Sequence, residues 1–500
     1  MTRPTMTRAT MRRPTALFLT VSGVLMLGAG ASVLVGPPSA GVARPPARPP
    51  VPVVRAGAVC PEPFQAAGAQ TVVGLAAPGL GADRESGQAR LAPLSRPNTP
   101  VVDLGSPADL AAAAAVPGES GALVGTATDA LAPGFAAMET TRTPGGDLRG
   151  LAGTACLPAG NEFWFVGSGA EVGQRGRLYL TNPEDAPAQV DVTLYGAAGE
   201  IDAPAGRGVS VAARGQEVLL LDALAPAIPR FGVHVQVRQG RVSAALRDQQ
   251  IRGLDPLGTD WVPAAAPPAR RIVLAGVPAG AGERRLQVLA PGAADAIVRV
   301  RLLAADGSFV PAGLDVIEVA AGTVGDVDLA PHAQEAAVAV ELTADTPVTA
   351  GLLARVGTGR EQPELAYTAA TSELTAQLPG VLALAAVDGA ATAELLLAAP
   401  DGAATVRVTP LHPAVGSPST VSVPAGGQVV VDLRSVSATP TFAVTVTPEG
   451  GSGPVFAARV LSGADTRGPM VTVSPLVPGR YLVRVPEVSA DLSTGLRGGP

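Results

Sequence analysis

Histidines and acidic residues are the side chains that could bind a metal or carry out hydrolysis here. The three histidines, His234, His332 and His412, are far apart in the sequence and show no metal-ligand spacing. His234 stands in an alternating, strand-like pattern, so we expect it to be solvated or locally hydrogen-bonded. Asp326 and Asp328 would share one face of a strand, but a Ca²⁺ ion needs about six or more oxygen ligands. We therefore predict no metal site, whereas a dispersed pair of glycosidase carboxylates stays open.

Ser120 is the serine whose neighbours are most typical of a nucleophile. Its segment, Gly-Glu-Ser-Gly at 118–121, is similar to the nucleophile segment of trypsin-like proteases. Those proteases place the histidine before the serine, whereas all three histidines follow Ser120 here. The chain has no Gly-x-Ser-x-Gly motif, and its 36 basic residues are all arginines, which removes every lysine-based mechanism. We predict no catalytic residue and no enzymatic activity.

The glycine-rich segment from Gly167 to Gly173 is close to a dinucleotide-binding loop. It follows a predicted strand, but its spacing is off by one residue. The next element reads as a strand, so no helix N-terminus could hold a pyrophosphate. We predict a glycine-rich hairpin turn and no cofactor.

Two tryptophans stand out in a chain that is only 3% aromatic. A sugar-binding platform would need Trp164 or Trp261 to be exposed. The alternative, which we favour, is that both rings anchor a core or a contact between domains.

Cys60 and Cys156 are the only cysteines, 96 positions apart. An oxidising compartment would favour a disulfide between them. A redox-active or nucleophilic cysteine is the weaker alternative, because there is no Cys-x-x-Cys motif and no nearby histidine.

A tandem repeat organises the segments that must position these side chains. Leu178, Leu286 and Leu395 occupy the same place in it, 108 and 109 positions apart, which indicates an array of small domains. The three copies are Arg177 to Arg247, Arg285 to Arg355 and Glu394 to Arg459.

The strands of each copy show a period of two. Val298, Val300 and Leu302 fall on one face, and Arg299 and Arg301 fall on the other. Roughly seven or eight short strands per copy is typical of an antiparallel, Ig-like β-sandwich, so we predict an all-β protein. A β-propeller-like ring is the alternative.

A degenerate copy is predicted before the regular three. Ala122–Ala127 and Pro133–Met138 parallel later strands, and the run of Ala and Leu from Pro107 to Val116 predicts one short helix.

The N-terminus predicts export. Residues 15–36 carry no charge and would span about 33 Å as a helix, enough for a hydrocarbon core of about 30 Å. The arginines before this segment place the N-terminus in the cytoplasm. Cleavage after residues 29–31 or 41–43 would make it a signal peptide, but its length favours an anchor.

Charge is divided unevenly along the chain. Seven arginines precede residue 56 without an acid, so the chain's net −6 leaves −13 on the remainder. An acidic body argues against nucleic-acid binding.

These patterns predict the following boundaries. They are a basic cytoplasmic tail at 1–14, a transmembrane helix or signal peptide at 15–36, a Pro-rich linker at 37–57, a divergent β domain at 58–160, β-sandwiches at 161–270, 271–378 and 379–485, and a loose tail at 486–500.

A resemblance rests on Phe163–Gly167, the Leu-x-Leu-x-Asn-Pro of 178–183, Gln189–Gly196, and DPLGTDWVP at 255–263. Together these segments resemble a family of actinobacterial exported proteins known only as a domain of unknown function. They are also similar to tandem β-sandwich modules of bacterial surface proteins. The resemblance covers roughly residues 58–485 and implies an exported, β-rich protein. The third copy has Ala399 where the first has Asn182, so it does not extend to that asparagine.

We expect a non-enzymatic protein of the cell envelope, anchored in the membrane or secreted. Its expected role is a scaffold or binding module for a protein or glycan partner. A carbohydrate hydrolase with dispersed carboxylates and a purely structural spacer are the alternatives.

Overall fold

The structure is a computed structural model that describes residues 50–79, 86–115, 121–359, 361–384, 392–412, 416–437 and 439–484. The predicted tail, membrane segment and C-terminal tail, and the segment 116–120 with Ser120, lie outside these residues. No helix in the described part of the chain is long and apolar enough to cross a bilayer. A compact unit from Pro52 to Val483 contains the four sandwiches described below.

Residues 55–155 form sandwich 1, whose two antiparallel sheets have the orders β2-β7-β4-β5 and β6-β3-β8-β9. Its strands are β2 (Arg55–Cys60), β3 (Gln70–Ala77), β4 (Gly87–Pro93), β5 (Val102–Leu104), β6 (Asp109–Ala115), β7 (Leu123–Asp129), β8 (Ala136–Thr143) and β9 (Gly150–Ala155). Cys60 and Cys156 are disulfide-bonded with a Cα–Cα distance of 4.3 Å.

Two predictions for this region were wrong. The Ala-rich segment is not a helix but strand β6, which pairs with β3 from Ala115 to Asp109. Sheet pairing outweighs the helix propensity of alanine, because propensity is a weak local preference. Strand β2 begins at Arg55, inside the range predicted as linker, because Ala56, Ala58 and Cys60 pack into the core of sandwich 1.

Residues 162–262 form sandwich 2, with the orders β10-β16-β12-β13, where β14 also pairs with β12, and β15-β11-β17-β18. Its elements are β10 (Glu162–Ser168), β11 (Gln174–Thr181), β12 (Ala188–Gly196), β13 (Gly199–Ile201), η1 (Pro204–Gly206), β14 (Val209–Val211), β15 (Gln216–Leu220), α2 (Leu221–Leu224), β16 (Phe231–Gln239), β17 (Ser243–Arg252) and β18 (Asp255–Val262). The glycine-rich segment is not a hairpin, because β10 and β11 belong to opposite sheets.

Residues 269–371 form sandwich 3. Its elements are β19 (Ala269–Val277), β20 (Arg284–Ala290), β21 (Ala296–Ala304), β22 (Gly307–Phe309), β23 (Ile317–Val319), β24 (Thr323–Asp328), η2 (Ala330–His332), β25 (Val338–Val356) and β26 (Glu364–Thr371). The long β25 belongs to both layers, since its first half pairs with β19 and β21 and its second half pairs with β20 and β26.

Residues 380–475 form sandwich 4, with the orders β27-β32-β29-β30 and β31-β28-β33-β34. Its elements are β27 (Gly380–Leu384), β28 (Thr392–Ala399), β29 (Ala404–Pro410), β30 (Ser419–Val423), β31 (Gly427–Asp432), η4 (Leu433–Ser435), β32 (Phe442–Pro448), β33 (Phe456–Asp465) and β34 (Gly468–Pro475). Strands β1 (Val51–Pro52) and β35 (Leu482–Val483) form a separate two-stranded sheet.

Alternating apolar residues fill each sandwich, as the period of two predicts. Val190, Val192 and Leu194 lie in the core of sandwich 2, Val298, Val300 and Leu302 in that of sandwich 3, and Val406 and Val408 in that of sandwich 4. No strand pairing links the sheets of different sandwiches among the described residues. Each sandwich has two packed layers of strands, whereas a propeller blade is a single four-stranded sheet.

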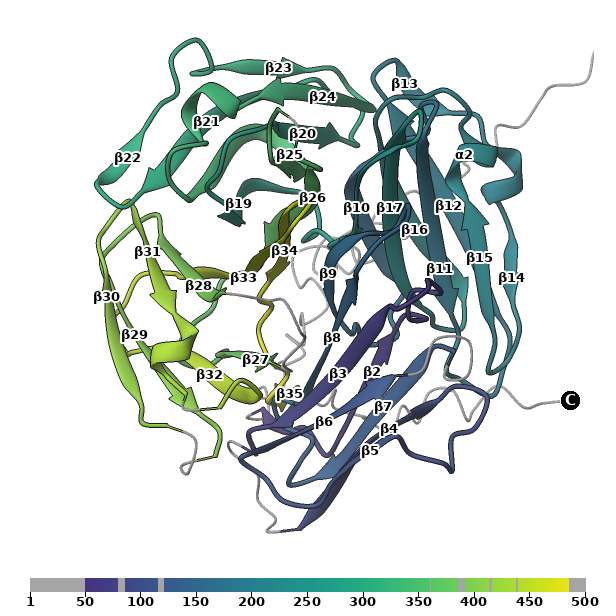
Figure 1. The fold of residues 1–500 in the computed structure, drawn as a ribbon, viewed down its shortest axis with the longest axis vertical. Coiled ribbons are helices and arrows are strands. Elements are labelled where there is room, and N and C mark those ends of the chain that lie inside the picture. The colour runs from purple at the N-terminus through teal and green to yellow at the C-terminus, as the bar shows by residue number, and fades with distance from the viewer. Residues whose placement is uncertain are drawn as a thin grey trace, which may run out of the picture. The chain divides into compact units, whose positions relative to one another are not determined.

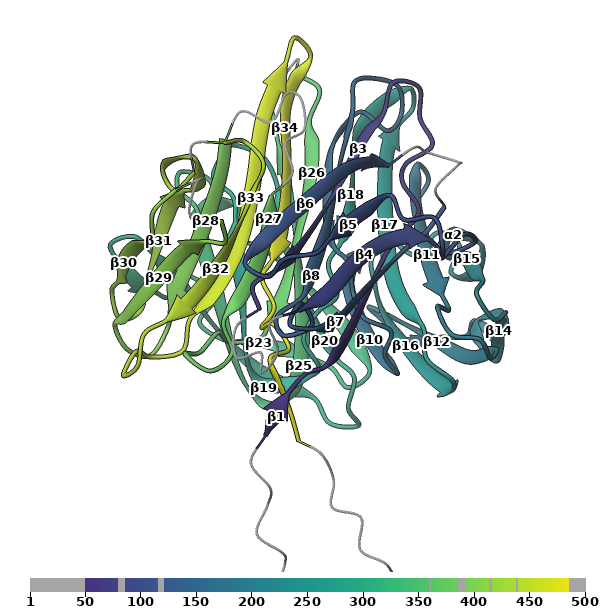
Figure 2. The same cartoon turned by 90° about the horizontal axis from the view of Figure 1, so that it is seen from below.

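The sandwiches do not form an open array with contacts only between sequence neighbours. The last strands β9, β18, β26 and β34 contact one another in a closed cycle, so sandwich 4 also packs against sandwich 1 (Figure 1). Figure 2 shows β34, β26 and β18 side by side. Apolar residues cross these contacts: Ala76 and Met138 of sandwich 1 belong to the cluster of sandwich 4, and Tyr367 of sandwich 3 belongs to that of sandwich 2. The repeat period predicts the successive sandwiches, but it does not report the additional contact between the first and the last of them.

Candidate functional site

The predicted histidine and acid candidates do not come together. His332 lies in η2, and no group of described residues could hold a metal ion. His234 stacks on Trp164 with ring centroids 3.7 Å apart and bonds Glu162 at 3.0 Å, so of the two predicted alternatives it is the locally hydrogen-bonded one. Burial lowers the pKa of His234.

Asp326 and Asp328 share a face of β24 and are occupied by arginine. Arg285 bonds Asp326 and lies 3.7 Å from Asp328, and Arg230 of sandwich 2 donates to Asp326 at 2.7 Å. The pair between Asp326 and Arg230 joins sandwiches 2 and 3, whereas Asp328 pairs within sandwich 3.

Both tryptophans are buried. Trp261 is 1% exposed and packs against Phe64 of sandwich 1 and Tyr179 of sandwich 2. Trp164 is 5% exposed beneath His234. Neither ring offers an open face to a sugar.

Asn182, the marker residue of the first copy, holds its own turn. Its side-chain amide donates to the carbonyls of Ala186, Val211 and Ala212 at 2.8–3.3 Å, and its oxygen accepts from the Glu184 amide at 2.9 Å. Its role is local, which fits its replacement by Ala399 in the third copy.

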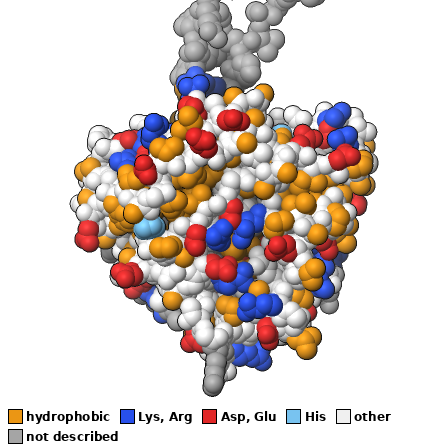
Figure 3. Space-filling view, turned by 90° about the horizontal axis from the view of Figure 1, so that it is seen from above, with side chains coloured by type: hydrophobic (Ala, Val, Ile, Leu, Met, Phe, Trp, Pro, Cys, Tyr) orange, Lys and Arg blue, Asp and Glu red, His pale blue; other side chains and the backbone are white. Residues whose placement is uncertain are grey.

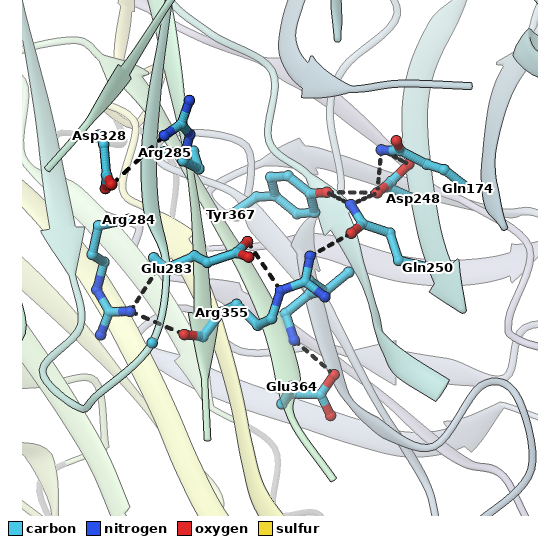
Figure 4. A network of polar contacts seen from close by, with 12 residues as sticks. Gln174, Asp248, Gln250, Glu283, Arg284, Arg285, Asp328, Arg355, Glu364 and Tyr367 are labelled. Carbon is cyan, nitrogen blue, oxygen red and sulfur yellow. Dashed lines mark hydrogen bonds and ion pairs between the residues drawn. The ribbon is translucent and has the colours of Figure 1, made fainter. Parts of the chain in front are cut away.

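A buried polar junction, which the sequence-based predictions do not include, lies where the four last strands meet. Its first group joins sandwiches 2 and 3 around Asp248 of β17. This carboxylate accepts from Tyr367 of β26 at 2.6 Å, Ser168 at 2.9 Å, Gln250 at 2.9 Å and Gln174 at 3.1 Å (Figure 4). Burial raises the pKa of Asp248, and these hydrogen bonds oppose the rise.

The group continues outward through arginine. Gln250 accepts from Arg355 at 2.7 Å, and Arg355 donates to Glu283 at 3.1 Å. The neighbouring Arg284 is buried and donates to backbone carbonyls, including that of Arg355 at 3.2 Å (Figure 4). Burial lowers the pKa of Arg284 to about 10, so it stays charged at neutral pH.

Asp260 of β18 joins three sandwiches. It accepts from the Gly153 amide of sandwich 1 at 3.2 Å, from Thr472 of sandwich 4 at 3.0 Å, and from the Trp261 amide at 2.8 Å. Burial raises the pKa of Asp260 well above its usual value. A Cβ at position 153 would lie 2.6 Å from the guanidinium group of the buried Arg459, so that side chain would have to shift.

Glu364 of β26, in sandwich 3, is the junction acid close to Asp260. It accepts from the amides of Thr259 and Leu365 at 3.3 and 3.0 Å. Burial raises the pKa of Glu364 well above its usual value, and the nearby Asp260 raises it further. Gly258, at φ +121°, lets the two backbones approach, since a Cβ there would lie 2.4 Å from the Leu365 nitrogen.

Arg149 closes the junction between sandwiches 1 and 4. It donates to the Asp465 carboxylate and to the Gly468 carbonyl, both at 2.7 Å, and to the Pro469 carbonyl at 3.3 Å. Its side chain is 1% exposed. This arginine connects residues that lie more than 300 positions apart.

Glu139 of sandwich 1 faces sandwich 2. It is fully buried, and neither carboxyl oxygen has a hydrogen-bond partner in the described part of the chain. Burial raises the pKa of Glu139 to about 8, while the nearby Arg247 opposes the rise. Arg247 itself stacks over Phe64, 4.8 Å from the ring centroid.

The chemistry of this junction is structural. Carboxyl groups with raised pKa are typical of general acids. Asp248, Asp260, Glu139 and Glu364 are nevertheless all fully buried, and the first two are held by several donors from the chain itself. A substrate cannot reach them without separating the sandwiches.

Two short segments carried a signal for the junction. Asp248-Gln249-Gln250 and Gly258-Thr259-Asp260 place polar residues on both faces of strands, where alternation would leave one face apolar. The second lies in the DPLGTDWVP motif, so part of that motif marks the junction.

An open groove of about 880 Å³ is the second feature, away from the junction acids. It lies among β2, the segment after β9, and the segment from Pro475 to Val483 that follows β34. Phe135, Met138, Leu476 and Val477 give it apolar walls. Its charged lining, as far as the described residues show, consists of one acid, Glu184, and four arginines, although the chain as a whole is acidic: Arg55, Arg214, Arg241 and Arg480.

Elsewhere the surface is mixed. Figure 3 shows a face on which arginines and acidic side chains are interspersed with apolar side chains. Such alternation of sign is ordinary for a soluble surface.

The fold and these two features define a class of repeat protein: four β-sandwiches closed in a cycle around a buried polar junction, with an apolar, arginine-lined groove. The chain belongs to the family of unknown function DUF5719, which it matches over residues 111–434. No curated protein matches the chain. A solved structure of Streptomyces avermitilis α-L-rhamnosidase complexed with L-rhamnose is similar at 11% identity, over 85% of this chain and 57% of that chain. Its TM-score of 0.11 carries no argument about fold or function.

Proposed function

We propose that this protein is a non-enzymatic, extracytoplasmic module that binds a protein partner in the groove between β2 and residues 475–483. The groove itself carries the proposal. It combines apolar walls of Phe135, Met138 and Val477 with exposed cations, a composition common at protein interfaces.

The position of the acids supports a role without catalysis. A glycosidase needs two carboxyl groups that flank a bound sugar. The acids with raised pKa that approach each other, Asp260 and Glu364, are sealed between sandwiches and bonded to backbone amides. These two sealed acids therefore do not support the alternative of an envelope hydrolase. A more open acid, Glu394, has a pKa raised by burial and by Asp432, which stands opposite it on the neighbouring strand.

Two further alternatives differ in what they require of the surface. A structural spacer would need no groove. A glycan partner would favour exposed aromatic platforms, whereas Trp164 and Trp261 are buried. The groove and the buried rings together favour a protein.

Site-specific photocrosslinking tests the proposal. A photoreactive phenylalanine analogue replaces Val477, which is 46% exposed in the groove, or Ile297, which is 41% exposed on β21 and serves as the control. Irradiation of whole cells should give a discrete, protease-sensitive adduct from position 477 and none from position 297. A ladder that glycan-degrading enzymes collapse would indicate a glycan, and no adduct at position 477 would refute the proposal.

The extracytoplasmic location is part of the proposal and rests on residues 15–36, which carry no charge and follow arginines. A reporter enzyme that is active only in the cytoplasm, fused after Pro500, should be silent. Activity of that fusion would contradict the proposed topology.

A further inference from the structure

The edge of strand β2 offers unused backbone hydrogen bonds to the groove. Val54 accepts from Asp129 through its carbonyl, so the even-numbered residues of β2 turn their backbone groups toward the partner strand β7. The odd-numbered residues turn theirs outward, because backbone groups alternate along a strand.

Within the described part of the chain, the outward edge forms backbone hydrogen bonds only at its two ends. Val53 donates to the Tyr481 carbonyl at 3.0 Å, and Val59 donates to the Leu157 carbonyl at 2.8 Å. Between them, Arg55 and Gly57 are exposed, and no backbone hydrogen bond within the described residues uses their outward amides or carbonyls. These four groups can pair with an added strand of about three or four residues, at about 3.3 Å per residue.

The walls beside this edge can accept alternate side chains of such a strand. Phe135, Met138 and Leu476 line the groove on one side of it, and Val477 is exposed at its rim. An added strand presents every second side chain to one face, so small or medium apolar side chains of that strand would pack against these walls.

Charge narrows the class of partner. Arg214 and Arg241 are paired with Asp185 and Glu184. Arg55 and Arg480 line the same groove, and neither makes an ion pair with another described residue. A carboxylate on the added strand would meet these cations without displacing an existing acid.

We propose that an extended acidic peptide, with apolar and acidic residues alternating, adds to the β2 edge at Arg55 and Gly57. This proposal rests on the proposed function, because it names the part of a protein partner that would occupy the groove. Backbone bonds supply binding that is independent of sequence, while the apolar walls and arginines select the side chains.

A matched pair of variants at position 57 isolates the backbone bond. Gly57→Ala keeps the outward amide, and the added Cβ meets only the Gly125 carbonyl at an ordinary 3.5 Å. Gly57→Pro removes that amide without removing a bond to β7, because Gly57 faces outward. Arg480→Glu reverses a charge on an exposed side chain and tests the cation separately.

The experiment selects phage-displayed random heptapeptides on the purified full-length protein and measures Kd for the strongest synthetic peptide. The enriched peptides should alternate apolar and acidic residues. Binding should weaken at least about tenfold in Gly57→Pro and in Arg480→Glu, and change less than about twofold in Gly57→Ala. No enrichment, basic peptides, or equal binding by the proline variant would each overturn the proposal.

Two further measurements separate the outcomes. If Gly57→Pro unfolds, Arg480→Glu still decides, since unchanged binding of the acidic peptide by that variant would refute the proposal. A concentration-dependent dimer that Gly57→Pro abolishes would assign the edge to a second copy of this chain instead. If the crosslinked adduct at position 477 persists in Gly57→Pro, the peptide proposal fails while the proposed function stands. If the protein without a substitution at Gly57 gives no adduct at position 477, both proposals fail.

Discussion

The sandwich cores and the junction between them are both buried, but the cores consist of apolar residues and the junction contains charged ones. Val190, Val300 and Val406 represent cores made of valine, leucine and alanine. The junction contains Asp260, Glu364 and further charged residues that are equally inaccessible to water. Apolar burial is non-directional and tolerates shifts in packing, whereas a buried carboxylate needs its donors at fixed positions.

This difference explains how four similar sandwiches adopt one defined orientation relative to each other. Apolar faces of similar composition would pack in many relative orientations. Asp260 is satisfied only when Gly153 and Thr472, from two other sandwiches, lie in place. We infer that the junction sets orientation and the cores supply stability, as buried polar groups do in some other proteins.

The largest expected effect comes from a charge placed in a core. Val300→Asp buries an unpaired carboxylate at a position that is 1% exposed and should cost more than about 5 kcal/mol. Both tryptophans lie in strands of sandwich 2, but Trp164 packs into the core of sandwich 3 that contains Val300, so tryptophan fluorescence reports on both sandwiches. Urea titration should show the fluorescence and the circular dichroism transitions shifting together, because Trp164 shares a cluster with Val300.

The matched control is Ile297→Asp, on the opposite face of the same strand and 41% exposed. It should change stability by less than about 0.5 kcal/mol. An unshifted fluorescence transition in Val300→Asp would mean that the sandwiches unfold independently.

The second effect concerns the disulfide bond of sandwich 1. Replacing both Cys60 and Cys156 by serine opens a loop of 96 positions and should cost about 4 kcal/mol on the chain-entropy account. Thermal unfolding of the exported protein with and without reductant measures the loss. Two free thiols found by mass spectrometry in unreduced, exported protein would contradict the bond.

The third effect compares a junction arginine with a surface arginine. Arg149→Met leaves the carbonyls of Gly468 and Pro469 without their donor and should cost about 3 kcal/mol. Arg407→Met breaks an exposed pair with Glu449 and should cost less than about 1 kcal/mol. Equal losses in denaturant titrations would remove the distinction between the junction and the surface.

The most gradual effect is the pH dependence from Glu139, which is spread over several pH units. Its folded-state pKa of about 8 exceeds the ordinary value of 4.5, so the folded protein keeps a proton that the unfolded chain releases. The resulting stability is complete below pH 4.5 and is lost as pH rises through about 8, with a slope of at most about 1.4 kcal/mol per pH unit.

Glu139→Gln should reduce that slope by the contribution of one titrating carboxyl group. The measurement is the free energy of unfolding as a function of pH from 5 to 8. Asp248, Asp260 and Glu364 also have raised pKa values, so part of the slope should remain. A variant whose slope equals that of the parent protein would show that Glu139 is charged in the fold.

Alternation along the strands was enough to predict the β-rich fold, because side chains such as Val298 and Leu302 repeat every second residue. The helix at Pro107–Val116 failed because pairing with β3 decides that segment, and pairing partners are not local. The junction was missed for the same reason, since Arg149 meets Asp465 and Asp260 meets Thr472 only after folding. The groove edge was also invisible, because an unused backbone group has no signature in side-chain type.

The contact between Val53 and Tyr481 can form only late in the synthesis of the chain. These residues are 428 positions apart, so at about 5–20 residues per second roughly 20–90 s pass during synthesis before the second follows the first. Sandwich 1 can complete its own sheets in that interval, but Ala76 and Met138, which sandwich 4 later covers, still face water. A nascent chain is therefore most prone to aggregation after its first domain has folded and before its last one has been made.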